Sequence, residues 1–88
     1  MKLIIAILRD NDSDTVSNAL TSAEFRVTRI ASTGGFLRRG NSTLLVGLDD
    51  ELVDKALDII RKTTPPSTEP NVSSATIFVL KVDQYTRI

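Results

Sequence analysis

The sequence predicts an α+β fold in which one antiparallel sheet of four strands carries two helices on one of its faces. Three observations lead to this prediction. Apolar runs of strand length stand near both ends of the chain, two stretches between them carry apolar residues at helical spacing, and all four glycines lie in the central stretch 26–47. The elements then follow the order strand, helix, strand, strand, helix, strand.

Length and composition place the chain among small globular proteins, and at 88 residues we expect a single domain over residues 1–88. Eleven basic residues balance eleven acidic ones, so no overall field would attract nucleic acid. The chain has neither cysteine nor histidine, which argues against a transition-metal site and against an enzyme. The opening apolar run is too short to cross a membrane, and we expect a cytoplasmic protein.

The first strand and the first helix are predicted from the first 23 residues. Residues 3–8 form a continuous apolar run, which is typical of a strand buried on both faces. The polar turn that follows offers Asn11, Asp12 or Ser13 as the N-cap of a helix. One narrow apolar stripe then recurs at helical spacing: Val16, Ala19, Leu20 and Ala23.

The centre of the chain reads as two antiparallel strands, 25–33 and 41–48, joined by a glycine loop over 33–41. Side chains two residues apart on a strand share a face, so Arg26 and Thr28 should project together. The loop holds large apolar residues beside two cations, which a simple turn does not need. We therefore interpret it as a binding loop.

The second half repeats the pattern of helix and strand. Asp49 or Asp50 is expected to cap a helix with a broad apolar face, and the three prolines of the loop 63–73 end it. The last strand is predicted over 74–82, and no structure is assigned to the tail. The resulting order is that of a ferredoxin-like fold.

The apolar pattern of the strands also predicts oligomerisation. Strands 3–8, 43–48 and 75–82 are apolar at both odd and even positions, yet the helices can cover only one face of the sheet. Soluble monomers avoid an apolar patch of that size. The second face is most simply buried against copies of the same chain.

The glycine loop could bind an anion. Successive backbone N–H groups at Gly34, Gly35 and Phe36 could form an anion-binding nest. Four side chains near the loop could add donors: Arg26, Thr28, Ser42 and Thr43. Phe36 and Phe78 offer rings on which a base could stack. A Gly-Gly pair is also found in plain hairpin turns, so these residues alone leave both interpretations open.

Several segments resemble the PII-like cyclic-di-AMP receptor family. They are Phe25-Arg26-Val27-Thr28, Ser32-Thr33-Gly34-Gly35-Phe36-Leu37-Arg38, Gly40-Asn41-Ser42-Thr43, Val46-Gly47 and Ala75-Thr76-Ile77-Phe78-Val79. The resemblance implies a PII-like homotrimer that binds cyclic di-AMP between neighbouring subunits, with no catalysis and no other cofactor. The ligand contacts that it implies are Arg26, Thr28, Gly35, Phe36, Leu37, Asn41, Gly47 and Phe78.

Two departures from the family leave the nucleotide open. The family carries a long glycine-containing insert where this chain has only the loop 63–73, and Arg87 stands where an amide is usual. The alternatives are another nucleotide, such as ATP, or a trimer without a ligand that presents its loops to a protein partner. Among the arginines we predict that Arg26 dominates over Arg38 and Arg39, because ordering side chains on a loop tip costs entropy.

Overall fold

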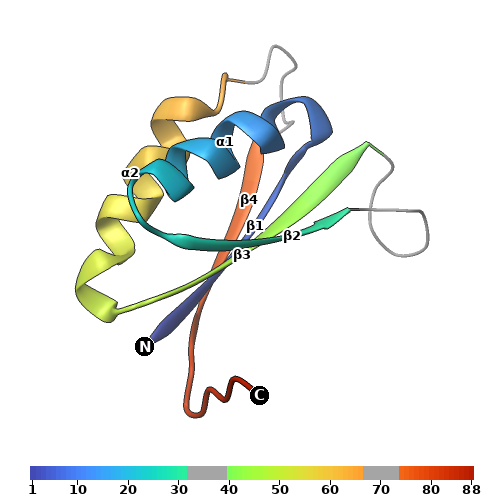
Figure 1. The fold of residues 1–88 in the computed structure, drawn as a ribbon. Helices are drawn as coiled ribbons and strands as arrows, with labels where there is room; N and C mark the ends of the chain where they lie inside the picture. The colour runs from blue at the N-terminus through green and yellow to red at the C-terminus, as the bar shows by residue number, and fades with distance from the viewer. Residues whose placement is uncertain (32–39, 67–73) are drawn as a thin grey trace.

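A computed structural model describes residues 1–31, 40–66 and 74–88 of the chain (Figure 1). Its elements are β1 (Lys2–Arg9), α1 (Asp10–Ser22), β2 (Arg26–Ala31), β3 (Asn41–Leu48), a short 3-10 turn η1 (Asp50–Leu52), α2 (Val53–Thr63) and β4 (Ala75–Lys81). This order of strands and helices confirms the one predicted from the sequence.

The four strands form one sheet in the order β2-β3-β1-β4, and every neighbouring pair is antiparallel. Both helices lie on the same face of the sheet (Figure 1). A four-stranded antiparallel sheet with two helices on one face is consistent with a ferredoxin-like arrangement. The other face, called the open face below, has no helix over it among the described residues.

The core lies between the sheet and the helices. In β1 the side chains of Ile4, Ala6 and Leu8 are fully buried against the helices, whereas alternate residues such as Ile5 are only half-buried. Val16 and Leu20 of the predicted α1 stripe are buried, together with Ala56 and Ile60 of α2 and Leu44 and Val46 of β3. Each large aliphatic side chain buried in this way contributes roughly 1.5–3 kcal/mol to folding.

Helix α1 begins earlier than the sequence indicated, and the expected cap at Asn11, Asp12 or Ser13 is wrong. The helix starts at Asp10, and no side chain caps it. The Asp10 N–H instead donates to the carbonyl oxygen of Gly40 at 2.7 Å, so a contact from another part of the chain satisfies one of the free amides. Ser13 lies in the first turn, where its hydroxyl donates to the Asp10 carbonyl at 2.9 Å.

The end of α1 has a Schellman-type closure without a glycine. Glu24 has a φ of 70°, in the left-handed region, and its N–H donates to the Thr21 carbonyl at 2.9 Å. The Phe25 N–H donates to the Leu20 carbonyl at 3.0 Å. This turn directs Phe25, which is 8% exposed, into the core and starts β2 at the next residue.

Helix α2 is also not capped as expected. Asp49 is at the N-cap of η1 without a side-chain hydrogen bond, and α2 begins at Val53 with Leu52 in the capping position. At its C-terminus the Thr64 hydroxyl donates to the Ile60 carbonyl at 2.6 Å. Pro65 follows and has no N–H with which to extend the helix.

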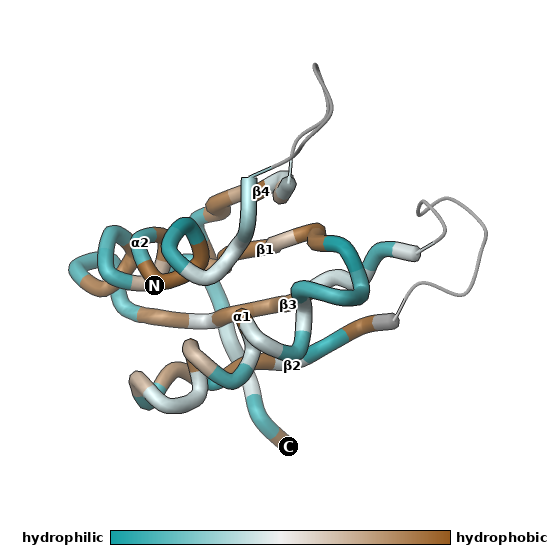
Figure 2. Tube along the Cα trace, turned by 90° about the horizontal axis from the view of Figure 1, so that it is seen from above, coloured by the Kyte–Doolittle hydropathy of each residue, from teal (hydrophilic) through white to brown (hydrophobic). Residues whose placement is uncertain are grey.

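The open face is apolar and partly exposed, as the strand pattern predicted. Its exposed apolar side chains include Ile30 (45%), Phe78 (51%) and Leu80 (46%). Figure 2 shows hydrophobic segments along β1 and β3, the two central strands. Within the described ranges, neither helix is long and apolar enough to cross a membrane.

Candidate functional site

Strand register brings the predicted polar residues of β2 next to β3 on the open face. Arg26 is paired with Gly47, and Thr28 is paired with Leu45. Gly47 is in turn paired with Leu3 of β1. Because residues opposite each other in a sheet share a face, Arg26, Thr28 and Gly47 all belong to the open face. The prediction that Arg26 and Thr28 project together is therefore confirmed.

These residues border a cavity of about 270 Å³ on the open face. Its walls come from the residue before β1, from β1, β2 and β3, and from the segment after β4: Met1, Leu3, Arg26, Thr28, Leu45, Gly47, Val82 and Tyr85. Three of the eight predicted ligand residues thus meet in one place. Met1, Val82 and Tyr85 were not anticipated, because isolated residues near the chain ends carry no periodic signal.

The N-terminal residue and the segment after β4 are joined beside this cavity. The Val82 N–H donates to the Met1 carbonyl at 3.1 Å, and the Met1 amino group lies 3.0 Å from a carboxylate oxygen of Asp50. The hydrogen bond from that amino group holds the pKa of the Asp50 carboxyl below its ordinary value of 3.8. A Cβ at Gly47 would come within 3.1 Å of the Met1 terminal methyl, so glycine helps to keep the cavity open.

The charges of β2 differ on its two faces. Arg29, on the helix side, forms an ion pair with Asp14 of α1. Arg26, on the open face, is exposed and has no ion-pair partner among the described residues. An exposed guanidinium such as that of Arg26 can donate to a phosphate in a bidentate manner.

The two other donors proposed from the sequence, Ser42 and Thr43, lie on opposite faces of the sheet. Ser42 is buried on the helix side, where its hydroxyl donates to the Asp10 carboxylate, so its expected role as a ligand donor is wrong. Thr43 lies on the open face, 7% exposed, opposite Ile30 and Ile7. Within the described ranges its Oγ1 is the one buried side-chain polar atom without a hydrogen-bond partner.

Two other predicted ligand residues that the structure describes, Asn41 and Phe78, do not line this cavity. Asn41 is half-buried at the opposite end of β3 from Gly47, about 20 Å away at the rise of an antiparallel strand. Phe78 shares the row of Thr28, Leu45 and Ile5 but stands on the far edge strand, about 14 Å across three strand spacings. Gly35, Phe36 and Leu37, like Arg38 and Arg39, lie outside the described residues.

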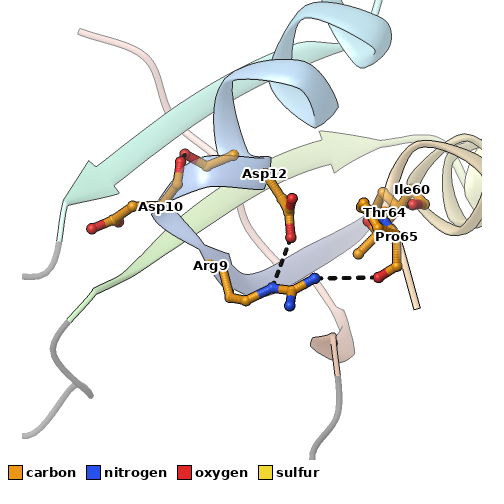
Figure 3. Close-up of polar contacts among 7 residues, drawn as sticks. Arg9, Asp10, Asp12, Ile60, Thr64 and Pro65 are labelled. Carbon is orange, nitrogen blue, oxygen red and sulfur yellow. Dashed lines mark hydrogen bonds and ion pairs between the residues drawn. The ribbon is translucent and has the colours of Figure 1, made fainter. Parts of the chain in front are cut away.

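The junction between β1 and α1 contacts the chain beside both loops, and Figure 3 shows the contacts made by Arg9. Arg9 pairs through Nε with Asp12 at 2.9 Å and donates through Nη2 to the Pro65 carbonyl at 3.3 Å, at the start of the proline loop. Asp10 binds Gly40 through its N–H and accepts from Ser42 through its carboxylate, on either side of Asn41. Two consecutive residues thereby fix the chain next to the glycine loop and the proline loop.

A second, larger cavity of about 480 Å³ lies between the end of α2 and the start of β4. Leu57, Ile60 and Ile77 form much of its apolar wall, and Arg61 is the one charged residue among its described lining. None of the predicted ligand residues that the structure describes borders it. We therefore assign the candidate site to the smaller cavity, where the guanidinium of Arg26, the hydroxyl of Thr28 and the backbone of Gly47 lie together. Over the described ranges there is no cluster of three side chains that could hold a metal ion.

Comparison with known proteins identifies the family. A sequence model of the cyclic-di-AMP receptor family matches residues 1–69. The chain therefore belongs to the cyclic-di-AMP receptor family, as its motifs indicated. It is also similar to a crystal structure of a functionally unknown protein from Pediococcus pentosaceus ATCC 25745, with 36% sequence identity and a TM-score of 0.80. That similarity covers 99% of this chain and 96% of the other.

Proposed function

We propose that this protein is a non-enzymatic signalling receptor that binds cyclic di-AMP at the subunit interfaces of a homotrimer. The observation that carries the proposal is the open-face cavity in which Arg26, Thr28 and Gly47 meet. The guanidinium of Arg26 and the hydroxyl of Thr28 suit the phosphodiester oxygens of a cyclic dinucleotide. Membership of the cyclic-di-AMP receptor family supports this ligand class.

The incomplete geometry of one chain supports an interface site. A cavity of about 270 Å³ is below the common range of ligand pockets, roughly 300–1,000 Å³. The remaining proposed ligand residues of the described chain, Asn41 and Phe78, lie far from Arg26. A ligand between two subunits would contact Arg26 of one chain and a different part of its neighbour. The exposed apolar side chains of the open face would be buried by the same association.

The test is isothermal titration calorimetry with cyclic di-AMP, cyclic di-GMP and ATP. We expect saturable heat with cyclic di-AMP and at least about tenfold weaker binding of the other two. A cyclic dinucleotide presents two phosphates and two bases, so it can use donors and stacking surfaces at the same time, whereas ATP has a single base.

Each other outcome selects one of the alternatives. Equal or tighter binding of ATP would make the protein a receptor for a different nucleotide. Absence of heat with all three nucleotides, from protein that light scattering shows to be assembled, would favour a trimer that serves only to bind a protein partner.

A further inference from the structure

We propose that Tyr85, in the segment after β4, is a ligand-contacting residue that stacks on a base of the bound nucleotide. The inference rests on the proposed nucleotide-binding function and adds a residue that neither the motifs nor the family match supplies. The matched region ends at residue 69, well before Tyr85. Among the residues that the structure describes, Tyr85 is the one aromatic side chain that lines the open-face cavity.

The path of the tail explains how Tyr85 reaches this cavity. Leu80 is paired with Leu3, Leu3 with Gly47, and Gly47 with Arg26, so β4 and β2 are three strand spacings apart, about 14 Å. The four residue-to-residue steps from Lys81 to Tyr85 span about 14 Å when the chain is extended. Figure 2 shows the tail running from β4 toward the β2 side of the sheet.

The tail is anchored where it leaves β4. The Val82 N–H donates to the Met1 carbonyl at 3.1 Å, and Met1 and Val82 both line the cavity. The chain beyond Val82 therefore leaves the edge of the sheet from a fixed point. Because the tail is already restricted by this hydrogen bond, ordering Tyr85 against a ligand costs less conformational entropy.

The environment of the ring fits a stacking role. Tyr85 is 54% exposed, so much of the ring is free of contacts within its own chain. Leu3 and Leu45 give the cavity apolar walls, while Arg26 and Thr28 supply donors. A nucleotide joins an apolar base to an anionic phosphate, and this cavity offers a surface for each. A base over Tyr85 would leave its phosphate within reach of Arg26.

The composition of the chain provides a direct measurement. Tyr85 is the only tyrosine, and the chain has no tryptophan, so intrinsic fluorescence excited near 280 nm reports on this residue alone. We expect cyclic di-AMP to quench this fluorescence with the same midpoint as the calorimetric titration. A solution of N-acetyltyrosinamide titrated identically corrects for absorption by adenine.

Variants separate stacking from a structural role. Tyr85→Ala should weaken binding at least about fivefold, in line with the lower end of base–aromatic stacking energies, while Tyr85→Phe keeps the ring and should bind within about twofold of the parent. The matched control is Thr86→Ala, at an exposed neighbouring residue that does not line the cavity. Light scattering of each variant checks that assembly is unchanged.

The outcomes distinguish this inference from the proposed function. Calorimetric binding without quenching beyond the N-acetyltyrosinamide control would overturn the role of Tyr85 and leave the receptor function in place. Parent-like or tighter binding by Tyr85→Ala, or a loss of binding explained by dissociation of the assembly, would overturn it as well. If no nucleotide binds the parent protein, both proposals fail.

Discussion

The prediction that most directly tests the site is a comparison of Arg26→Ala with Arg29→Ala. The two arginines lie on the same strand but on opposite faces of the sheet. Arg26 borders the open-face cavity, whereas Arg29 pairs with Asp14 of α1. The two variants remove the same charge from nearly the same place, so they differ only in the surroundings of that charge.

The magnitudes follow from those surroundings. A hydrogen bond between charged partners contributes roughly 1.5–3 kcal/mol, so Arg26→Ala should weaken cyclic di-AMP binding about ten- to a hundredfold. Arg26 is exposed and unpaired among the described residues, and its loss should change the free energy of unfolding by less than about 0.5 kcal/mol. Arg29→Ala breaks an exposed ion pair worth about 0–1 kcal/mol and should leave the affinity unchanged.

The assay is calorimetric titration of the parent and both variants at low and high salt, with urea unfolding as the control for stability. Salt screens the parent more than the variant, so the difference in affinity should narrow as ionic strength rises. Arg26→Lys should recover only part of the affinity, because an ammonium cannot donate in the bidentate manner of a guanidinium. Parent-like affinity in Arg26→Ala, together with weakened binding in Arg29→Ala, would refute the assignment of the open face.

Two further predictions concern the framework of the site. Asp10→Ala should lower the free energy of unfolding in urea by about 1–3 kcal/mol, because it leaves the buried Ser42 hydroxyl unpaired. Ser42→Ala should lower it by less, because the exposed Asp10 carboxylate can then be hydrated by water. A larger loss of stability in Ser42→Ala than in Asp10→Ala would contradict this account. Light scattering should give about three times the 9.6 kDa mass of one chain, and Leu45→Asp on the open face should reduce it; a monomeric parent would contradict the interface argument.

Alternation along the strands could be read from the sequence, and the helix ends could not. Side-chain parity is a local property of a strand, so the shared face of Arg26 and Thr28 followed from their spacing. The start of α1 depends on the Asp10 N–H reaching Gly40, thirty residues further along the chain. Capping preferences describe side chains near the helix and cannot anticipate such a partner.

The conformation at the end of α1 and the position of the tail could not be predicted from the sequence, for different reasons. Glu24 adopts a left-handed conformation that is usually signalled by glycine, so no residue type marked this turn. Tyr85 follows no apolar period, and its relation to Arg26 arises only when the tail passes from β4 toward β2. For the site, the spacing of Arg26 and Thr28 predicted their shared face, and the family resemblance added Gly47. Ser42, a possible donor on the residues alone, instead lies on the helix side and donates to Asp10.

A site divided between subunits links recognition to assembly. The chain has no net charge, so long-range attraction cannot concentrate an anionic ligand, and selectivity must come from local donors and surfaces. In the proposed arrangement those donors stand on the same apolar face that association buries. A ligand that contacts two subunits binds the assembly more tightly than the separated chain, and by linkage it stabilises the assembly to the same extent. The open face would thus convert the concentration of a nucleotide into the stability and shape of a trimer, without any chemical step.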